Sequence, residues 1–181
     1  MTAIGVVEAL SIPLGVLAGD RMLKTAEVAL VAAQTACAGK YIVVVSGETA
    51  AVKSAVAAGE EAAGAALVDS LLIPNIDERV AAAMAGACDV TEVRAVGVME
   101  TFSLASAIHA ADIAVKAAAV ELIEVRLGRG LGGKSFLVAT GEVAAVEAAM
   151  EAAETQAGEE GLIAGSVVIP APHRDMIRAL L

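Results

Sequence analysis

Hydrophobic and polar residues follow a regular order along the chain, and this order predicts a series of short strands and helices. Ile4–Ala9 is rich in β-branched residues and predicts a strand. Ser11 and Pro13 are typical of a helix cap followed by a first-turn proline, which indicates a helix that runs to about Thr25. The same reasoning predicts strands at Val28–Ala33, Tyr41–Val45 and Leu67–Ile73, and helices at Glu48–Ala63 and Asp77–Ala87.

The same pattern occurs a second time in the chain. Ala3–Leu30 aligns without gaps on Ala95–Leu122, and 11 of the 28 positions are identical. Lys40–Gly64 aligns on Lys134–Gly158, and 12 of the 25 positions are identical. The identical positions include Gly, Glu, Asp and Lys, which an alanine-rich composition alone cannot place in register. The chain is therefore an internal duplication.

Each copy has the order strand, helix, strand, strand, helix, strand, followed by a terminal helix. This is the order of the ferredoxin-like, split βαβ arrangement. We therefore predict an α/β (α+β) fold with two tandem domains, at residues 1–90 and 91–181, each a four-stranded antiparallel sheet with helices. The copies diverge in one loop, Thr35–Lys40 in the first and Leu127–Lys134 in the second, and loops are where duplicated domains usually specialise.

The composition favours a well-packed protein without a membrane span. Hydrophobic residues make up 58% of the chain and charged residues 19%, which argues against disorder. Mean hydropathy is high, at +0.77. However, the longest stretches without charge, Val28–Gly39 and Gly161–His173, are shorter than the roughly 18 apolar residues that a spanning helix needs. No basic segment precedes an apolar segment at Met1, so we expect a soluble cytoplasmic protein without a secretory signal.

Charge and cysteine content exclude further classes of protein. The net charge is −10 and the basic residues are scattered singly, which argues against nucleic-acid binding. Two Phe, one Tyr and no Trp also offer little surface for base stacking. Cys37 and Cys88 lie far apart without a CxxC motif, so a disulfide framework is not indicated. A metal site built from one chain alone would lack ligands.

Several motifs together resemble the shell domains of bacterial microcompartments. They are Ala3–Glu8 and Ala95–Thr101, the pairs Asp20 with Lys24 and Asp112 with Lys116, the glycine-bearing loops that end in Lys40 or Lys134, and Ile169–His173. The resemblance covers essentially the whole chain, twice. Two unpermuted copies are similar to the tandem-domain class, in which three chains form a ring with the outline of a hexamer. The two loops are most similar to those of the propanediol-utilisation type, which is reported to hold an iron–sulfur cluster at its central pore.

The resemblance implies a pore lined by the two loops of each chain. The implied lining residues are Ala36, Cys37, Ala38, Gly39, Arg129, Gly130, Leu131 and Gly132. Cys37 is the candidate metal ligand, because a threefold axis would bring three thiolates together and three cysteine sulfurs can anchor a 4Fe–4S cluster. The alternative for Cys37 is a small buried hydrophobe or a redox-silent loop thiol. Arg129 would give the pore a cationic residue, or else is a solvated loop charge.

The resemblance also implies shell-edge contacts. Lys24 and Lys116 fall where shell domains place the edge lysine that packs against neighbouring rings, and His173 is expected at an edge as well. Each lysine follows an aspartate by four residues, so the alternative is an intrahelical ion pair worth a few tenths of a kcal/mol. Ala171 occupies the place where shell domains often carry Arg, so this chain lacks the side chain that such edge contacts use.

No residue set has the layout that catalysis requires, so we do not expect an enzyme. Gly130–Gly133 lacks the spacing of a phosphate-binding loop and joins two predicted strands, so no helix N-terminus faces an anion there. His109 has no Ser or Cys partner nearby and is expected at the surface or as a satisfied core residue. Cys88, at the end of an alanine-rich helix, is expected to be a packed core thiol.

The sequence therefore favours a structural protein of a bacterial microcompartment shell. We expect a homotrimer that contacts other shell proteins, with encapsulated redox enzymes as further candidate partners, and with no nucleic-acid or membrane partner. Its pore would hold one 4Fe–4S cluster, shared by three chains, that carries electrons across the shell. Two alternatives remain: a metabolite-conducting pore without a cluster, and a duplicated ferredoxin-like sensor that binds a small molecule between its domains.

Overall fold

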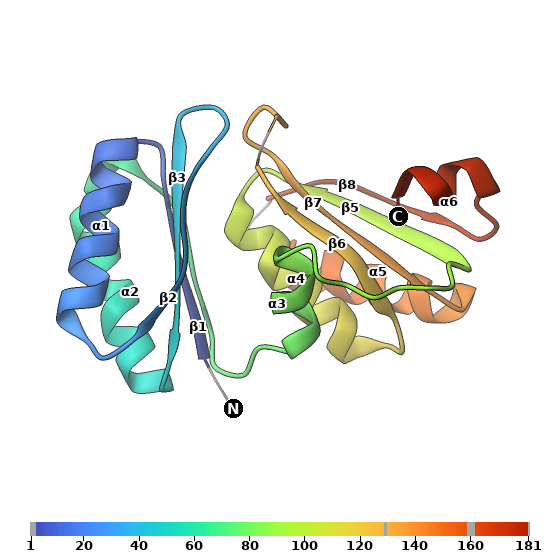
Figure 1. Ribbon diagram of the computed structural model, residues 1–181, viewed down its shortest axis with the longest axis horizontal. Coiled ribbons are helices and arrows are strands. Elements are labelled where there is room, and N and C mark those ends of the chain that lie inside the picture. The colour runs from blue at the N-terminus through green and yellow to red at the C-terminus, as the bar shows by residue number, and fades with distance from the viewer. Residues whose placement is uncertain (1–2, 129, 159–161, 181) are drawn as a thin grey trace. The chain divides into compact units, whose positions relative to one another are not determined.

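The computed structural model describes residues 3–128, 130–158 and 162–180 (Figure 1). The chain divides into two compact units. The first contains the chain up to Ile76, together with two segments of the second copy, Ser103–Ala105 and Gly128–Lys134; the second contains the rest. The boundary at residue 90 expected from the sequence stays a prediction.

The first unit is one antiparallel sheet with two helices. Its elements are β1 (Ala3–Ala9), α1 (Ile12–Thr25), β2 (Ala29–Ala36), β3 (Lys40–Gly47), α2 (Thr49–Ala63), a 3₁₀ turn (Gly64–Ala66) and β4 (Leu67–Ile73). The strands lie in the order β2-β3-β1-β4. Helices α1 and α2 pack against each other and cover one face of the sheet (Figure 1). The core between these helices and the sheet is built mainly from Val and Ala, and Met22 is its largest fully buried side chain.

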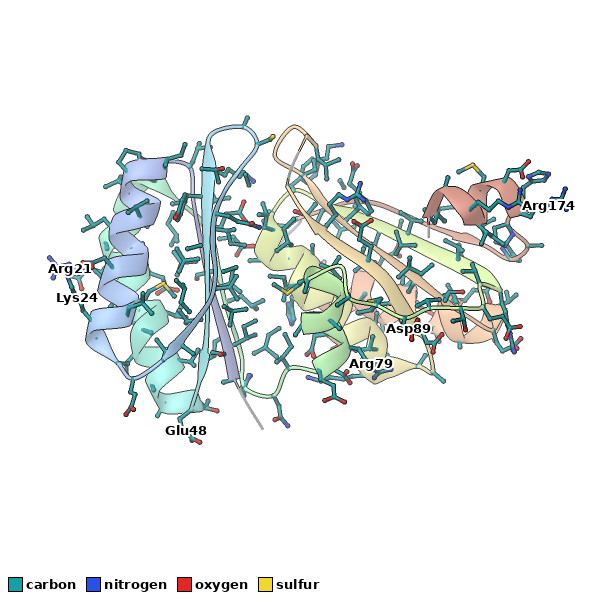
Figure 2. All side chains as sticks on the ribbon, in the orientation of Figure 1. Arg21, Lys24, Glu48, Arg79, Asp89 and Arg174 are labelled. Carbon is teal, nitrogen blue, oxygen red and sulfur yellow. The ribbon has the colours of Figure 1, made fainter. Side chains whose placement is uncertain are left out.

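Local sequence signals set the ends of these helices. The Ser11 hydroxyl accepts the N–H of Leu14 at 3.4 Å, and Pro13 lies in the first turn, as predicted. Gly64 ends α2 with a φ of 51°, a conformation that glycine adopts without the steric cost of a Cβ. Arg21 and Lys24 project from the outer side of α1 (Figure 2), and Lys24 lies in the last turn, where a cation interacts favourably with the helix dipole.

The second unit repeats this architecture. Its elements are α3 (Glu78–Met84), β5 (Ala95–Thr101), α4 (Leu104–Ala117, whose first two residues belong to the first unit), β6 (Glu121–Leu127), β7 (Ser135–Gly141), α5 (Val143–Ala157), β8 (Ile163–Ile169) and α6 (Arg174–Leu180). The strand order β6-β7-β5-β8 is the counterpart of the order in the first sheet. The predicted fold class, two four-stranded antiparallel sheets with helices, is confirmed.

The third helix and the thiol that follows it differ from the prediction. Helix α3 ends at Met84 rather than at Ala87, because Gly86 adopts a φ of 66° that does not continue a helix. Cys88 therefore lies beyond the helix and is half-buried. The expectation of a packed core thiol is wrong, although burial still raises the pKa of Cys88.

Helix α3 closes the first repeat in sequence but packs on β6, a strand of the second repeat. Its N-cap is Asp77, which accepts the N–H of Arg79 at 3.0 Å. The Arg79 guanidinium donates to the carbonyl oxygens of Val115 at 2.9 Å and Val120 at 3.1 Å. The N–H of Asp77 donates to Asp112 Oδ1 at 2.9 Å. These bonds fix α3 against the connection between α4 and β6.

The Asp77–Arg79 pair predicts a pH-dependent contribution to stability. Hydrogen bonds from Arg79 hold the pKa of the Asp77 carboxyl at about 2, below its usual value of 3.8. Asp77→Asn keeps a good N-cap but removes the charge, so we expect it to lower the free energy of unfolding by about 1 kcal/mol at pH 6. Because the folded-state pKa is lowered, this difference is fully present above pH 3.8 and is lost as the pH falls through about 2.

Urea unfolding of both proteins between pH 2 and pH 7 measures this difference. Glu78→Gln, which changes an exposed carboxylate one residue further along, is the control and should alter the pH profile far less. A stability difference between native protein and Asp77→Asn that stayed constant over the whole pH range would contradict the assignment.

Candidate functional site

Two loops, one from each copy, come together in the first unit. Cys37–Gly39 connects β2 to β3, and the loop that begins at Gly128 connects β6 to β7. The N–H of Cys37 donates to the carbonyl oxygen of Gly128 at 2.7 Å. In return, the N–H of Gly130 donates to Cys37 Sγ at 3.1 Å. The loops that the sequence singled out as divergent therefore form one structural feature.

Glycine is required where these loops touch. Gly128 has a φ of 62°, and a Cβ on it would lie 2.8 Å from the Cβ of Ala36. Gly133 has a φ of 90°, and a Cβ there would lie 3.2 Å from the carbonyl oxygen of Cys37. A larger residue would meet both backbone strain and a neighbouring chain segment. The glycine-rich composition of the second loop thus lets it approach the first.

A buried ion pair holds the base of the two loops. Lys40, the first residue of β3, donates from Nζ to the carbonyl oxygen of Gly133 at 2.9 Å. The same Nζ lies 2.6 Å from Oε1 of Glu8, a fully buried residue of β1. Glu8 Oε2 accepts the N–H groups of Leu104 at 2.7 Å and Ala105 at 3.4 Å. Burial raises the pKa of Glu8, while Lys40 and the two N–H groups act in the opposite direction.

The Glu8–Lys40 ion pair was not predicted from the sequence. The sequence did contain an indication of this pair, however, because the same Glu and Lys occur at equivalent positions of both copies. Glu8 corresponds to Glu100, and Lys40 corresponds to Lys134. Charged residues kept in register in so apolar a chain indicate a shared structural task. In the first copy that task is to anchor the loop that carries Cys37.

Cys37 has the features of an accessible ligand. Its side chain is half-buried at the start of the hairpin loop, and its sulfur accepts the N–H of Gly130. Ala38 and Gly39 beside it are exposed, and a Cβ on Gly39 would have no atom within 4 Å. In the described part of the chain, no three or more His, Cys, Asp and Glu side chains form a group that could hold a metal ion.

The remaining pore candidates have different exposures. Gly130 and Gly132 are exposed and Leu131 is half-buried, whereas Ala36 is buried beneath Gly128. Arg129 lies outside the described residues. Their roles in lining a pore stay predictions.

The three edge candidates are accessible. Lys24 pairs with Asp20 at 2.8 Å, so the intrahelical pair forms while the lysine stays exposed. Lys116 pairs in the same way with Asp112 at 2.5 Å. His173 is exposed, with Nδ1 3.6 Å from an oxygen of Asp175. Edge contacts through these side chains stay predictions.

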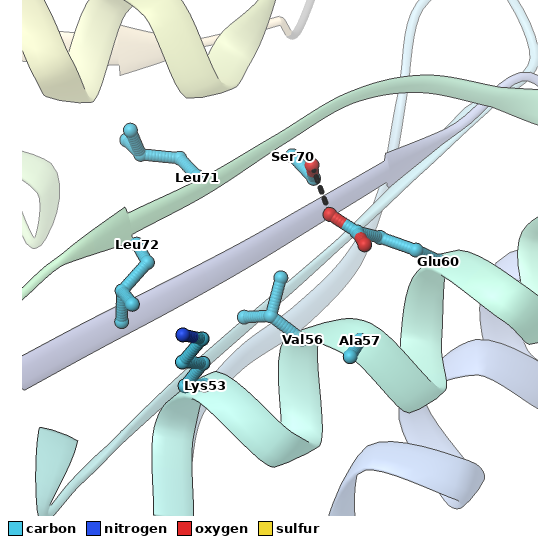
Figure 3. Close-up of a pocket in the computed structure, with 7 residues that line it drawn as sticks. All are labelled: Lys53, Val56, Ala57, Glu60, Ser70, Leu71 and Leu72. Atoms are coloured by element: carbon cyan, nitrogen blue, oxygen red, sulfur yellow. Dashed lines mark hydrogen bonds between the residues drawn. The ribbon is translucent and has the colours of Figure 1, made fainter. Parts of the chain in front are cut away.

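A shallow pocket in the first unit lies between α2 and β4 (Figure 3). Its walls are mainly apolar, and its polar groups are Lys53, Glu60 and Ser70. The Ser70 hydroxyl donates to Glu60 Oε1 (Figure 3). No histidine is among the residues that line this pocket, so it does not have the Ser–His layout of a hydrolytic site.

The duplicated ferredoxin-like fold and its paired loops define a class of tandem-domain protein, and comparison with known proteins identifies the family. A family model described as the BMC domain matches residues 3–76 and 95–172. The chain belongs to the BMC domain family, and it is a structural shell protein of bacterial microcompartments. This membership confirms the expected shell location and the expectation that the protein is not an enzyme.

Individual relatives sharpen this assignment. The chain is 45% identical over 179 residues to the bacterial microcompartment shell protein PduT of Citrobacter freundii, covering 99% of this chain and 97% of that protein. A crystal structure of a microcompartment protein from Desulfitobacterium hafniense DCB matches with a TM-score of 0.88 and 46% identity, covering 98% of this chain and 99% of that one. The shell protein PduA of Citrobacter freundii is 39% identical over 87 residues, 48% of this chain and 90% of PduA. A one-domain relative thus corresponds to half of the duplicated chain.

In the part of the chain that the structure describes, no helix combines the length and the apolar character needed to cross a bilayer.

Proposed function

We propose that three copies of this chain form a ring with a central pore, and that three Cys37 thiolates, one from each copy, hold a 4Fe–4S cluster in that pore. The cluster would carry electrons across the shell, to or from encapsulated redox enzymes. The observation that carries this proposal is the half-exposed Cys37 sulfur, placed by a bond between the two loops. Each chain supplies one thiolate, so a threefold axis supplies the three that a cluster needs.

Exposed apolar residues support association into a ring. Ile12 and Val16 on α1 are exposed, whereas the residues at the same positions of α4, Leu104 and Ile108, are fully buried. Large apolar surfaces of this kind mark contacts with other chains. Because copies that associate around a closed axis cover such surfaces in a symmetric way, a homotrimer accounts for this difference between the repeats.

The residues around Cys37 suit a bound cluster. The Gly130 N–H donates to the sulfur, and such a bond stabilises negative charge on a thiolate and tunes the potential of a metal centre. Ala38 and Gly39 leave room for close approach. The Lys40–Glu8 ion pair and the bond from Lys40 to Gly133 anchor the base of the Cys37 loop, so the thiol is held in one place before any ligand binds. When bound, the cluster itself supplies one-electron transfer.

Anaerobic reconstitution tests the proposal. The native protein should bind about four iron atoms per three chains and give an EPR signal in one redox state. Cys37→Ser should lose the iron and the signal while remaining a trimer by native mass spectrometry. Cys88→Ser is the matched control and should keep both, because Cys88 follows α3 and belongs to neither loop. Full iron content in the Cys37→Ser protein would overturn the cluster assignment.

A pore that conducts small metabolites without a cluster is the second candidate. The exposed, uncharged residues Ala38, Gly130 and Gly132 favour it, because small side chains leave space for solutes. Under this alternative, native protein and the Cys37→Ser variant both form trimers and neither binds iron.

A further inference from the structure

We propose that the terminal helix α6 of one copy docks on strand β2 of the next copy in the ring, as α3 docks on β6 within the second unit. This inference rests on the proposed trimer and identifies a part of its interface. The partner is a second copy of this chain. Its contact surface is an apolar strand face with one carboxylate beside it.

The template for this contact is visible in the second unit. On α3, Val80 and Ala83 are buried where the helix lies on β6. On β6, Leu122 is buried as well. Ala82 and Leu122 line one small pocket, which places this turn of the helix beside the start of the strand. A seven-residue helix therefore covers one apolar strand end.

The counterparts of these residues are exposed in α6. Helices α3 and α6 have the same length and follow the equivalent strands β4 and β8. Met176 stands where α3 has Val80, and it is 58% exposed. Ala179 stands where α3 has Ala83, and it is exposed too. The face that α3 buries is therefore uncovered on α6.

Strand β2 shows the matching exposure. Leu30 corresponds to Leu122, and it is 50% exposed. Both strands have a register shift at this point, between Leu30 and Ala32 in one and between Leu122 and Glu124 in the other. The two strand ends thus share the same register shift, and in the described part of the chain β6 has the short helix α3 on it, whereas β2 is contacted by α1.

The polar groups around the contact are repeated in part. Asp112 receives the N–H of Asp77, and its side chain is 6% exposed. Its counterpart Asp20 pairs with Lys24 through Oδ2 and is 50% exposed. The counterpart of Asp77 is His173, whose N–H would donate to Asp20 of the next copy. Asp175 stands where α3 has Arg79, so α6 lacks the bonds that Arg79 makes to carbonyl oxygens, and its docking is expected to be weaker.

The order of the repeats explains why a second copy is the partner. Helix α3 ends one repeat and packs on a strand of the repeat that follows it. In a ring of three chains, the repeat beside the second repeat of one copy is the first repeat of the next copy. Leu180 packs against the apolar cluster of its own sheet formed by Val96, Ile123 and Val138. That contact leaves Met176 and Ala179 uncovered.

Site-specific photo-crosslinking tests this contact. The photoreactive amino acid p-benzoylphenylalanine replaces Arg178, whose side chain is 72% exposed, in otherwise native full-length protein. Arg178 is the counterpart of Ala82, so the crosslink should reach the peptide around Leu30. The same replacement at Ala82 is the matched control and should label the peptide around Leu122 within one chain. Mixed samples of ¹⁴N-labelled and ¹⁵N-labelled protein show by mass spectrometry whether the joined peptides come from different copies.

The expected result is a covalent dimer and trimer from position 178, with mixed-isotope peptides, and a product of monomer size from position 82. Native mass spectrometry of the unmodified protein is measured in parallel. A trimer whose position 178 labels its own chain, another segment or a neighbouring ring would overturn this inference alone. Absence of a trimer would overturn both this inference and the proposed ring.

Discussion

Lys40→Met is expected to lower the free energy of unfolding by about 3 kcal/mol at pH 7, because it leaves a buried carboxylate without its cation. Lys40 is the cation 2.6 Å from Glu8, whose side chain is fully buried. Methionine fills a similar volume but offers no charge and no donor for the carbonyl oxygen of Gly133. Breaking one half of a buried ion pair costs far more than loss of a surface pair, since the remaining charge is not solvated.

The pH dependence of this variant gives a second measurement. Burial raises the pKa of Glu8 above its usual value of 4.5, and removal of Lys40 raises it further. A carboxyl with a raised folded-state pKa contributes stability that is present below 4.5 and is lost as the pH rises through the folded-state pKa. The destabilisation of Lys40→Met should therefore be largest at neutral pH and smaller near pH 4.

Two further variants control for loss of packing. Glu8→Gln combined with Lys40→Met removes both charges, so it should recover at least half of the loss seen in Lys40→Met alone. Lys134→Met, the counterpart in the second copy, should cost less, because Glu100 is half-buried and keeps access to water. Urea unfolding at one fixed chain concentration measures all four proteins. If the double variant were no more stable than Lys40→Met, the charge-based explanation would be wrong.

The sequence predicted the elements well where the apolar pattern and a cap agree. Leu67–Ile73 was predicted with both of its ends, and Ser11 and Gly64 mark the start of α1 and the end of α2 as expected. The duplication helped, because each element could be compared with its counterpart. Strand β2 was predicted to end at Ala33, but it continues to Ala36, since backbone pairing with β3 extends through the exposed residues near the loop.

The candidate site was predicted in part. The position of Cys37 in a short loop and the role of the second loop as its neighbour followed from the repeat and from the family resemblance. The Glu8–Lys40 pair did not, because the two residues meet only through the sheet register, which sets Glu8 opposite Ile42 on β3. The packing of α3 on the second copy was also beyond reach, since sequence order alone assigned that helix to the first domain.

Gly5→Ala is expected to lower the free energy of unfolding by about 3 kcal/mol, and Gly97→Ala, at the same position of the second copy, by about 1 kcal/mol. A Cβ on Gly5 would lie 2.5 Å from Val56 Cγ2 and 2.7 Å from Val52 Cγ1. Valine side chains on a helix are held in one rotamer, so α2 itself must move away from β1.

At the equivalent position of the second copy, Gly97, one of the neighbouring side chains is more flexible. A Cβ on Gly97 would lie 2.8 Å from Val146 Cγ1 and 3.0 Å from Cγ and Sδ of Met150. Methionine has a flexible, unbranched side chain that can move aside, so less of the strain reaches the backbone. Thermal and urea unfolding of the two variants measure the difference. Val56→Ala added to Gly5→Ala should restore part of the lost stability, because it removes the nearer methyl group. Equal losses of stability in Gly5→Ala and Gly97→Ala would contradict this explanation, because they would show that the Met neighbour yields no more than the Val neighbours.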